Sequence, residues 1–303
     1  MPRPCRRRFL AISAAATATL GLPAAAGPVT RWRGVAMGSA AAITVAHPQA
    51  DLLIEAARAE IAGLGDVFSL WRQGSARARL NADGTLESPP HELVECLALA
   101  DAVHRATGGA FDPTVQPLWA AHATAWAAGR PPEAGAIAAA LARTGWADVS
   151  VGPGRIALAR PGMALTLNGI AQGFVADRVA RLLVAAGLRD VLIDTGEAVA
   201  RGHDPAGSPW AALLPDGRRE ALRDTALATS APLGTVFDGD GTQGHILDPA
   251  TGLPAPPRWR FVSVAAPSGS VADALSTAGC LLTPPALAAA LAAFPGARLV
   301  ASA

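Results

Sequence analysis

Strand-like and helix-like segments follow one another along this chain, and neither a linker nor an internal repeat divides them. Helices are expected at 51–65, 91–107 and 172–187, whereas the short apolar runs 191–194 and 261–265 are typical of buried strands. We therefore expect an α+β fold in which helices pack against mixed or antiparallel sheets. If the fold has two lobes, they must be interleaved in the sequence. With 51% hydrophobic residues among 303, the chain can bury a full core.

The remaining elements are shorter. Gly108 is expected to end the second helix, and Gly152 to Gly154 should form the turn of a hairpin. An Arg-rich polar loop is expected between Trp71 and Gly84, and the Pro-rich stretch 110–119 should lack regular structure. Further strands are expected at 41–46, 149–151, 156–158, 198–202, 210–214, 226–230, 244–248 and 297–301, and further helices near 116–128, 133–144 and 284–294.

Residues 1–26 have the composition of a removable leader. They contain four Arg and no acidic residue, and an apolar run from Leu10 to about Leu22 follows the basic start. Arg6-Arg7-Arg8-Phe9-Leu10 resembles a twin-Arg export signal, and Ala24-Ala25-Ala26 offers small residues for cleavage. The alternative is an uncleaved membrane anchor, for which the apolar run is short. We expect a periplasmic protein with one domain at 27–303 that does not span a membrane.

The charge balance of the remaining domain argues against a nucleic-acid partner. Removing the leader's four Arg from 25 basic residues leaves 21 basic against 24 acidic residues, and no Lys is present. A nucleic-acid-binding domain would show a basic patch. Two Cys remain, Cys96 and Cys280, both in apolar helical contexts. We expect two buried thiols, with a single disulfide as the alternative, and no zinc or iron–sulfur site.

The stretch from Ser270 to Leu282 is expected to begin a helix, and it carries two candidate oxygen ligands on one face. Asp273 and Thr277 are four residues apart, so both side chains project from the same side. A carboxylate and a hydroxyl without neighbouring Cys or His suit a hard cation such as Mg²⁺. Alternatively, Ser268 or Ser270 caps the helix, Asp273 completes a capping box with Ser270, and Thr277 packs in the core.

Several other polar motifs have simple structural explanations. The stretch from Gly239 to Gly244 matches G-x-G-x-x-G, but no helix is expected after it, so a hairpin loop is favoured over a dinucleotide site. His245 follows an expected strand and can be structural. Asp112 and Asp248 each precede a Pro and suit turns. Asn168-Gly169 can form a tight turn or present its backbone carbonyls and amides to a ligand.

A series of short motifs occurs in a defined order along the chain. The motifs are Met37-Gly38-Ser39, Phe68-Ser69-x-Trp71, Leu80-Asn81, Thr107 to Thr114, Leu167 to Phe174 with Asp177, Ile193-Asp194-x-Gly196, Ala228-Thr229-Ser230, His245-x-x-Asp248-Pro249-x-Thr251-Gly252 and Ala272 to Thr277. Taken together, the series resembles the ApbE family, the FAD:protein FMN transferases. The resemblance covers about residue 30 to the end of the chain, and its last two motifs are the most specific.

The resemblance implies a two-lobed, T-fold-like α+β architecture and a transferase of phosphorus-containing groups. Such an enzyme uses Mg²⁺ to transfer FMN from FAD to a Thr or Ser hydroxyl of a target protein, forms a phosphoester and releases AMP. The implied partner is a redox protein of a membrane electron-transfer complex that carries a motif of the type Asp-x-x-Ser/Thr-Gly-Ala-Thr. The alternatives are a FAD-binding accessory protein, similar to the NosX branch, and a FAD pyrophosphate hydrolase.

The resemblance also implies the residues of the site. Asp273, Thr277 and the backbone carbonyl of Gly169 would bind Mg²⁺, for which Mn²⁺ and Ca²⁺ are alternatives. His245 is hypothesised to deprotonate the acceptor hydroxyl or to stabilise the pyrophosphate, so His245 and Asp273 are the catalytic candidates. The expected FAD-binding residues are Met37, Trp71, Ala110, Phe111, Asp112, Thr166, Gln172 and Ile246.

This chain departs from the family pattern at and near these positions. Many members have Asp-Leu-Gly-Gly-Ile-Ala-Lys-Gly where this chain has Thr166 to Gly173, so neutral Thr166 and Gln172 replace an acid and a base. Ala231 stands where many members have Gly. Because one acidic and one basic residue are lost together, the local charge stays balanced and a covarying variant of the site is expected.

Overall fold

The computed structural model describes residues 29–69 and 72–303, so the expected leader and Trp71 lie outside the described residues. The main sheet has seven strands in the order β1-β2-β6-β7-β10-β11-β12, and all neighbouring strands are antiparallel. The expectation of an α+β fold with antiparallel sheets is confirmed. In that order the strands are Val29–Ala36, Ser39–Ala46, Val191–Asp194, Ala198–Arg201, Thr225–Ser230, Val262–Ala266 and Arg298–Ser302.

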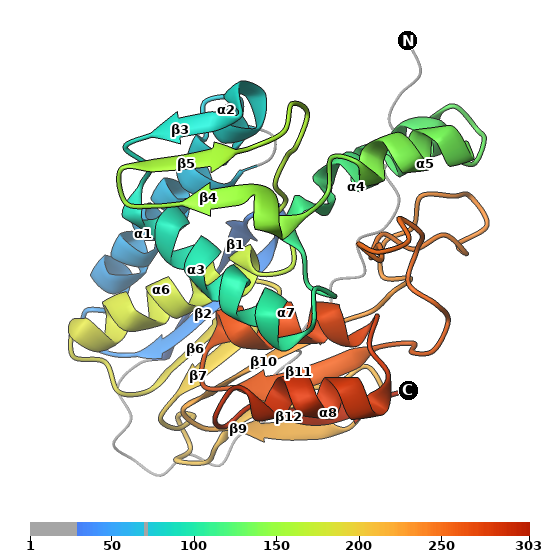
Figure 1. The fold of residues 1–303 in the computed structure, drawn as a ribbon. Coiled ribbons are helices and arrows are strands. Elements are labelled where there is room, and N and C mark those ends of the chain that lie inside the picture. Colours follow the sequence, from blue (N-terminus) through green and yellow to red (C-terminus); the bar gives the residue numbers. More distant parts are fainter. Residues whose placement is uncertain (1–28, 70–71) are drawn as a thin grey trace.

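Helices cover one face of this sheet (Figure 1). α1 (Ala50–Phe68) packs against β1 and β2, α6 (Ala171–Ala185) against β6 and β7, and α7 (Gly269–Gly279) against β10 and β11. α3 (His91–Ala106) contacts α1 and α7, and α8 (Pro284–Ala292) packs beside β12. These helices bury the main hydrophobic core between them and the sheet.

A small sheet lies on the other side of the helical layer (Figure 1). Its order is β3-β5-β4, formed by Thr85–Glu87, Arg155–Leu158 and Val149–Val151, and the predicted hairpin between β4 and β5 is confirmed. The two Ala-rich helices are also found, as α4 (Gln116–Ala127) and α5 (Ala134–Leu141). All segments from α1 to α6 are inserted between β2 and β6 of the main sheet, so the two sheets are interleaved in sequence.

The opposite face of the main sheet is covered by a separate hairpin of β8 (Trp210–Leu213) and β9 (Arg219–Leu222). Trp210 and Leu222 of this hairpin form a second, smaller core with Leu227 of β10 and Ala265 of β11. The expected strand at 210–214 therefore exists, but it does not continue the main sheet. Strands β10 and β11 therefore contribute buried side chains to a hydrophobic core on each face of the sheet. This burial holds β11, the strand that leads into α7.

Two other sequence expectations are corrected by the structure. The segment 244–248 is not a strand, because it forms only the isolated bridges Val236↔Gly244 and Leu247↔Pro254 within the connection between β10 and β11. The first of these bridges closes the Gly-rich stretch into a loop, as expected, and no helix follows it. Strand β1 was not predicted. Cys96 and Cys280 are free and buried, so the expectation of two buried thiols is confirmed and the disulfide is excluded.

The prediction of an Arg-rich loop before Gly84 is wrong for most of that segment, because the segment contains helix α2 (Ala76–Asp83). The Ser75 side chain accepts the Ala78 N–H as an N-cap, and Gly84 ends the helix in the left-handed conformation. Arg77 is fully buried. Its Nε donates to the Phe68 carbonyl at 2.9 Å and its Nη1 to the Leu165 carbonyl at 3.0 Å. One charged side chain therefore ties the end of α1 to the segment before α6.

Replacing Arg77 should destabilise the protein, although no carboxylate of the described residues pairs with it. Arg77→Met removes charge-assisted hydrogen bonds to two buried carbonyls, so we expect a loss of about 3 kcal/mol in the free energy of unfolding. Urea denaturation measures this loss. The control is Arg79→Met on the exposed side of the same helix, which should stay within about 0.5 kcal/mol of wild type. Equal effects of the two substitutions would contradict the structural role of Arg77.

Candidate functional site

The predicted site residues gather around one cavity of about 300 Å³. It lies where the loop after α3, the segment before α6, helix α7 and the connection between β10 and β11 meet. Among the predicted residues, its lining includes Ala110, Phe111, Asp112, Thr166, Gly169, Gln172, His245, Ile246, Asp273 and Thr277. Segments that are more than 160 residues apart in the sequence thus meet at one place. Their individual roles remain predictions.

Met37 lies beside this cavity rather than in it. It occupies the two-residue turn between β1 and β2 with φ 51°, followed by Gly38 at φ 85°. A positive φ is uncommon for Met and costs free energy. Met37 lines a second cavity of about 550 Å³ that shares Asn168 with the first. The predicted role of Trp71 falls on a residue outside the described part of the chain.

Helix α7 places Asp273 in the lining of the cavity. Ser268 is the N-cap of this helix and accepts the Val271 N–H, so the expected capping box between Ser270 and Asp273 is not formed. Asp273 is instead 3% exposed, and its Oδ2 accepts the Gly173 N–H at 3.2 Å. Burial raises the pKa of Asp273 to about 7, the Gly173 hydrogen bond lowers it, and the charge of Asp177 raises it.

The three predicted metal ligands lie close to one another. A Cβ at Gly169 would be 3.0 Å from Thr277 Oγ1, so this backbone approaches the Thr277 hydroxyl as only Gly can. The same hydroxyl is 3.2 Å from Ser230 Oγ at the end of β10. No ion pair to Asp273 is formed by any residue of 29–69 or 72–303. A buried carboxylate that lacks a cationic partner and lies beside a hydroxyl fits an oxygen-ligated cation.

Across the described ranges, no three His, Cys, Asp or Glu side chains form a cluster that could hold a metal ion. The predicted ligand set is of another kind, because it combines one carboxylate with a hydroxyl and a backbone carbonyl. Hard cations such as Mg²⁺ are held by few protein oxygens and keep positions for substrate oxygens. The donor set is therefore consistent with Mg²⁺.

Glu197 also lines the cavity, although the sequence analysis did not select it. It is 7% exposed, and its Oε2 accepts the Thr229 N–H at 3.2 Å. Burial raises the pKa of Glu197 well above its usual range, and the nearby charge of Asp273 raises it further. The signal was present, because Glu197 directly follows the Asp194-x-Gly196 motif at the end of a strand. Two buried carboxyl groups therefore share this cavity, and a bound cation would favour their ionised forms.

His245 lies at the cavity wall in the connection between β10 and β11. Its Nδ1 donates to the Thr235 carbonyl at 3.0 Å, which leaves the lone pair on Nε2. Burial lowers the pKa of His245, although hydrogen bonds to backbone carbonyls oppose this. The imidazole is therefore neutral near pH 7 and can accept a proton at Nε2. Asp248 forms the expected turn, since its Oδ1 accepts the Ala250 N–H at 2.8 Å.

The residues that depart from the family pattern are held by hydrogen bonds within the chain. Gln172 Nε2 donates to Ser39 Oγ at 2.7 Å and to the Thr195 carbonyl at 3.1 Å. The Thr195 hydroxyl donates back to the Gln172 carbonyl at 2.9 Å. The Thr166 N–H donates to the Pro113 carbonyl at 2.8 Å. A neutral amide satisfies these acceptors, so the Gln172 side chain is fixed although no charge is present.

Phe111 and Asp112 enter the cavity from a rigid turn. The Phe111 carbonyl is 2.8 Å from His104 Nδ1, and Asp112 Oδ1 accepts hydrogen bonds from the Thr114 N–H and hydroxyl at 2.7 and 2.6 Å. Asp112 is thus a turn residue, as its position before Pro113 predicts, and it lines the cavity as well. The short 3₁₀ turn Pro113–Val115 then leads into α4.

Comparison with known proteins gives a consistent result. The model of the ApbE family matches residues 37–299. A FAD:protein FMN transferase of Klebsiella pneumoniae is 31% identical over 84% of this chain and 76% of its own length. One from Treponema pallidum is 34% identical over 76% of this chain and 71% of its own length.

Solved structures show the same similarity. The apo form of the flavinyl transferase ApbE of Pseudomonas stutzeri has a TM-score of 0.78 at 27% identity, covering 93% of this chain and 97% of that one. The ApbE protein of Thermotoga maritima has a TM-score of 0.80 at 27% identity, covering 90% and 93%. The similarity therefore extends over both sheets and the helical layer.

Proposed function

Because the chain belongs to the ApbE family, we propose that it is a FAD:protein FMN transferase. The observation that supports this most directly is the single cavity around which the oxygen donors Asp273, Thr277 and Gly169 and the neutral His245 meet. In the proposed reaction, the acceptor hydroxyl oxygen attacks the FMN phosphorus of FAD. The bond from this phosphorus to the bridging oxygen breaks, AMP leaves with that oxygen, and the hydroxyl proton passes to a base.

We assign the binding of Mg²⁺ to the Asp273 carboxylate, the Thr277 hydroxyl and the Gly169 carbonyl. The bound ion would neutralise charge on the pyrophosphate oxygens. Ser230 orients the Thr277 hydroxyl, and the Gly173 N–H orients the Asp273 carboxylate. We assign FAD binding to residues around the first cavity and to Met37, which lines the second cavity. The residues around the first cavity are Ala110, Phe111, Asp112, Thr166, Gln172 and Ile246.

We assign the base to His245 Nε2. His245→Ala should lower kcat by roughly 10²-fold or more, because general base catalysis contributes about that much, and should leave FAD affinity unchanged. At saturating Mg²⁺, wild-type kcat should fall as the pH drops through the lowered pKa of His245, below pH 6.5. This acid limb should be absent in His245→Ala. His47→Ala, which does not line the cavity, is the control. An unchanged profile in His245→Ala would contradict the assignment.

We also propose that the acceptor is a redox protein of a membrane complex and that the enzyme works in the periplasm. The location rests on the Arg6-Arg7 leader, which lies outside the described residues. Among the described residues, no helix is both long and apolar enough to cross a membrane. Expression of the full chain, followed by cell fractionation and N-terminal sequencing, tests the location. A protein found in the cytoplasm with residues 1–26 still attached would contradict the proposed location.

The test of the activity is an intact-mass measurement. The protein without its leader is mixed with FAD, Mg²⁺ and an acceptor domain that carries an Asp-x-x-Thr-Gly-Ala-Thr motif. We expect the acceptor to gain the mass of FMN less one water, with AMP released and with no gain in EDTA. FAD binding without any gain would identify an accessory protein. Free FMN and AMP without acceptor modification would identify a pyrophosphate hydrolase. Either result overturns the proposal.

A further inference from the structure

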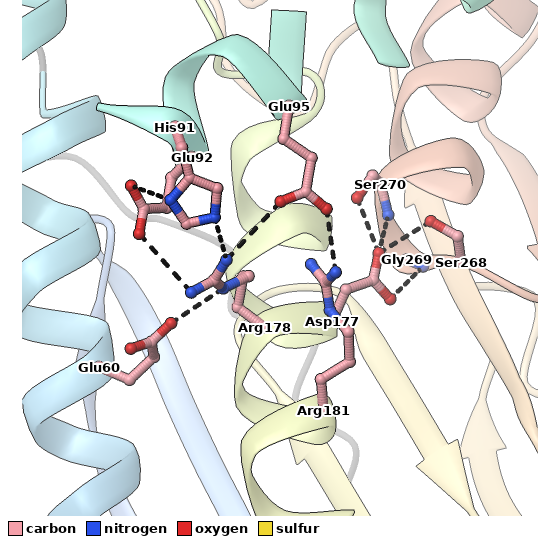
Figure 2. Close-up of polar contacts among 10 residues, drawn as sticks. All are labelled: Glu60, His91, Glu92, Glu95, Asp177, Arg178, Arg181, Ser268, Gly269 and Ser270. Atoms are coloured by element: carbon pink, nitrogen blue, oxygen red, sulfur yellow. Dashed lines mark hydrogen bonds and ion pairs between the residues drawn. The ribbon is translucent and has the colours of Figure 1, made fainter. Parts of the chain in front are cut away.

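Asp177 of α6 reaches across to the beginning of α7 (Figure 2). Its side chain is 8% exposed and accepts four hydrogen bonds. Oδ1 accepts the Gly269 N–H at 2.7 Å. Oδ2 accepts the Ser270 N–H at 2.9 Å and the hydroxyls of Ser268 and Ser270 at 2.8 and 2.7 Å. A carboxylate from another helix thus binds the first turn of α7.

This arrangement satisfies backbone N–H groups that no α7 carbonyl can reach. The first N–H groups of a helix lack partners within the helix and carry partial positive charge. Ser268 caps the Val271 N–H, whereas Asp177 takes those of Gly269 and Ser270. A buried, charged acceptor makes stronger hydrogen bonds than a neutral one. The start of α7 is therefore held against α6 and not only capped by its own residues.

A second contact between the same helices lies one turn earlier on α6. A Cβ at Gly173 would be 2.2 Å from the Gly269 carbonyl oxygen, so the two backbones touch. The Gly173 N–H donates to the Asp273 carboxylate. Asp273 and Thr277 lie four and eight residues after Gly269, on the same side of α7. Any shift of the first turn of α7 would therefore move both predicted ligands.

We propose that Asp177 is a positioning residue for the cation site. It fixes the start of α7 against α6 so that the Asp273 carboxylate and the Thr277 hydroxyl stay at one spacing in the cavity. The inference rests on the proposed function, because it presumes that these two groups bind a cation. It extends that function to a residue that lines neither cavity and touches neither ligand directly.

Arg178, the next residue, provides a matched comparison. It points to the other side of α6, where its Nε donates to Glu60 of α1 at 3.0 Å (Figure 2). Its Nη atoms lie 3.6 Å from Glu92 and Glu95 of α3 and 3.2 Å from His91 Nε2. Both residues thus tie α6 to other helices through a charged, largely buried side chain. Only Asp177 ties it to the helix that carries Asp273.

The test measures Mn²⁺ binding to the whole domain by electron paramagnetic resonance of free Mn²⁺, with FAD present and acceptor absent. Wild type, Asp177→Ala, Asp177→Asn and Arg178→Gln are compared, and the thermal unfolding of each is recorded. We expect Asp177→Ala to raise the Mn²⁺ dissociation constant about 10- to 100-fold, the range found for partners that orient metal ligands. Asp177→Asn keeps an acceptor oxygen and should recover part of the affinity. Arg178→Gln should lower the unfolding temperature but leave Mn²⁺ affinity unchanged.

Two results with the variants would overturn the inference. One is an unchanged Mn²⁺ affinity in a folded Asp177→Ala protein. The other is an equal loss of affinity in Arg178→Gln, which would show that any weakening of α6 has this effect. If Asp177→Ala does not fold, the partial variant Asp177→Asn decides by the same criteria. Wild type that binds Mn²⁺ but transfers no FMN would contradict the proposed function alone, whereas wild type that binds no Mn²⁺ would contradict both.

Discussion

Asp273→Asn is expected to abolish FMN transfer and at the same time to stabilise the metal-free protein. Removing the only carboxylate of the predicted ligand set should lower kcat/KM by roughly 10³-fold or more, since such electrostatic groups contribute several kcal/mol to phosphoryl transfer. The stabilisation follows from burial. At pH 8 the metal-free protein holds an ionised carboxylate that is 3% exposed and has no cationic partner within 29–69 or 72–303, which is unfavourable.

The pH dependence of this stabilisation has a defined sign. The pKa of Asp273 is about 7 in the folded protein and 3.8 ordinarily, so the folded state holds this proton more tightly than the unfolded chain. The free energy of unfolding therefore falls as the pH rises from about 4 to about 7. Each unit of difference corresponds to about 1.4 kcal/mol, so the total is a few kcal/mol. Asp273→Asn should lack this fall, and Glu197, relieved of a neighbouring charge, should add to the effect.

Thermal unfolding in EDTA at pH 5 and pH 8, for wild type and Asp273→Asn, measures this difference. Added Mg²⁺ should raise the unfolding temperature of wild type only. Asp240→Asn in an exposed loop is the control and should change neither activity nor stability. Retained FMN transfer in Asp273→Asn would exclude Asp273 as a metal ligand. A variant less stable than wild type at pH 8 would show that the buried charge is compensated within the chain.

The sequence predicted the position of helix α7 better than it predicted the contacts at the start of this helix. The spacing of Asp273 and Thr277 correctly placed both on one helix face, because spacing is a local property. The capping box was wrong because Asp177, nearly a hundred residues earlier in the chain, binds the first turn of α7 instead. Local patterns contain no information about such a partner, so the competing cap could not be excluded from sequence.

Helix α2 and strand β1 were missed for different reasons. The Arg-rich composition around Arg77 suggested a polar loop, although Ser75 and Gly84 were present as local cap signals. Only the folded chain shows that the carbonyls of Phe68 and Leu165 surround the Arg77 side chain. Strand β1 ends in a two-residue turn whose first residue, Met37, has a positive φ. Because a non-Gly residue rarely adopts that conformation, the pattern gave no hairpin signal.

The second large expected effect is a loss of stability when Gly173 of α6 is replaced. Gly173→Ala should destabilise the protein by about 3 kcal/mol or more, although Gly→Ala within a helix usually stabilises by about 1 kcal/mol. The new Cβ would lie 2.2 Å from the Gly269 carbonyl oxygen and 2.7 Å from the Ser270 nitrogen. Both are backbone atoms, so no side chain can rotate away and α6 and α7 must separate. The separation also stretches the hydrogen bond from the Gly173 N–H to Asp273.

Urea denaturation compares this variant with Gly63→Ala in α1, where the added Cβ meets nothing within 4 Å. The same Gly→Ala substitution should thus change the stability in opposite directions at the two positions. It should lower the urea midpoint at Gly173 and raise it at Gly63. Mn²⁺ affinity should fall only in Gly173→Ala, because that change alone moves the helix that carries Asp273 and Thr277. If Gly173→Ala were as stable as wild type, the two helices could not be in backbone contact, and the fixed spacing of the two ligands would need another cause.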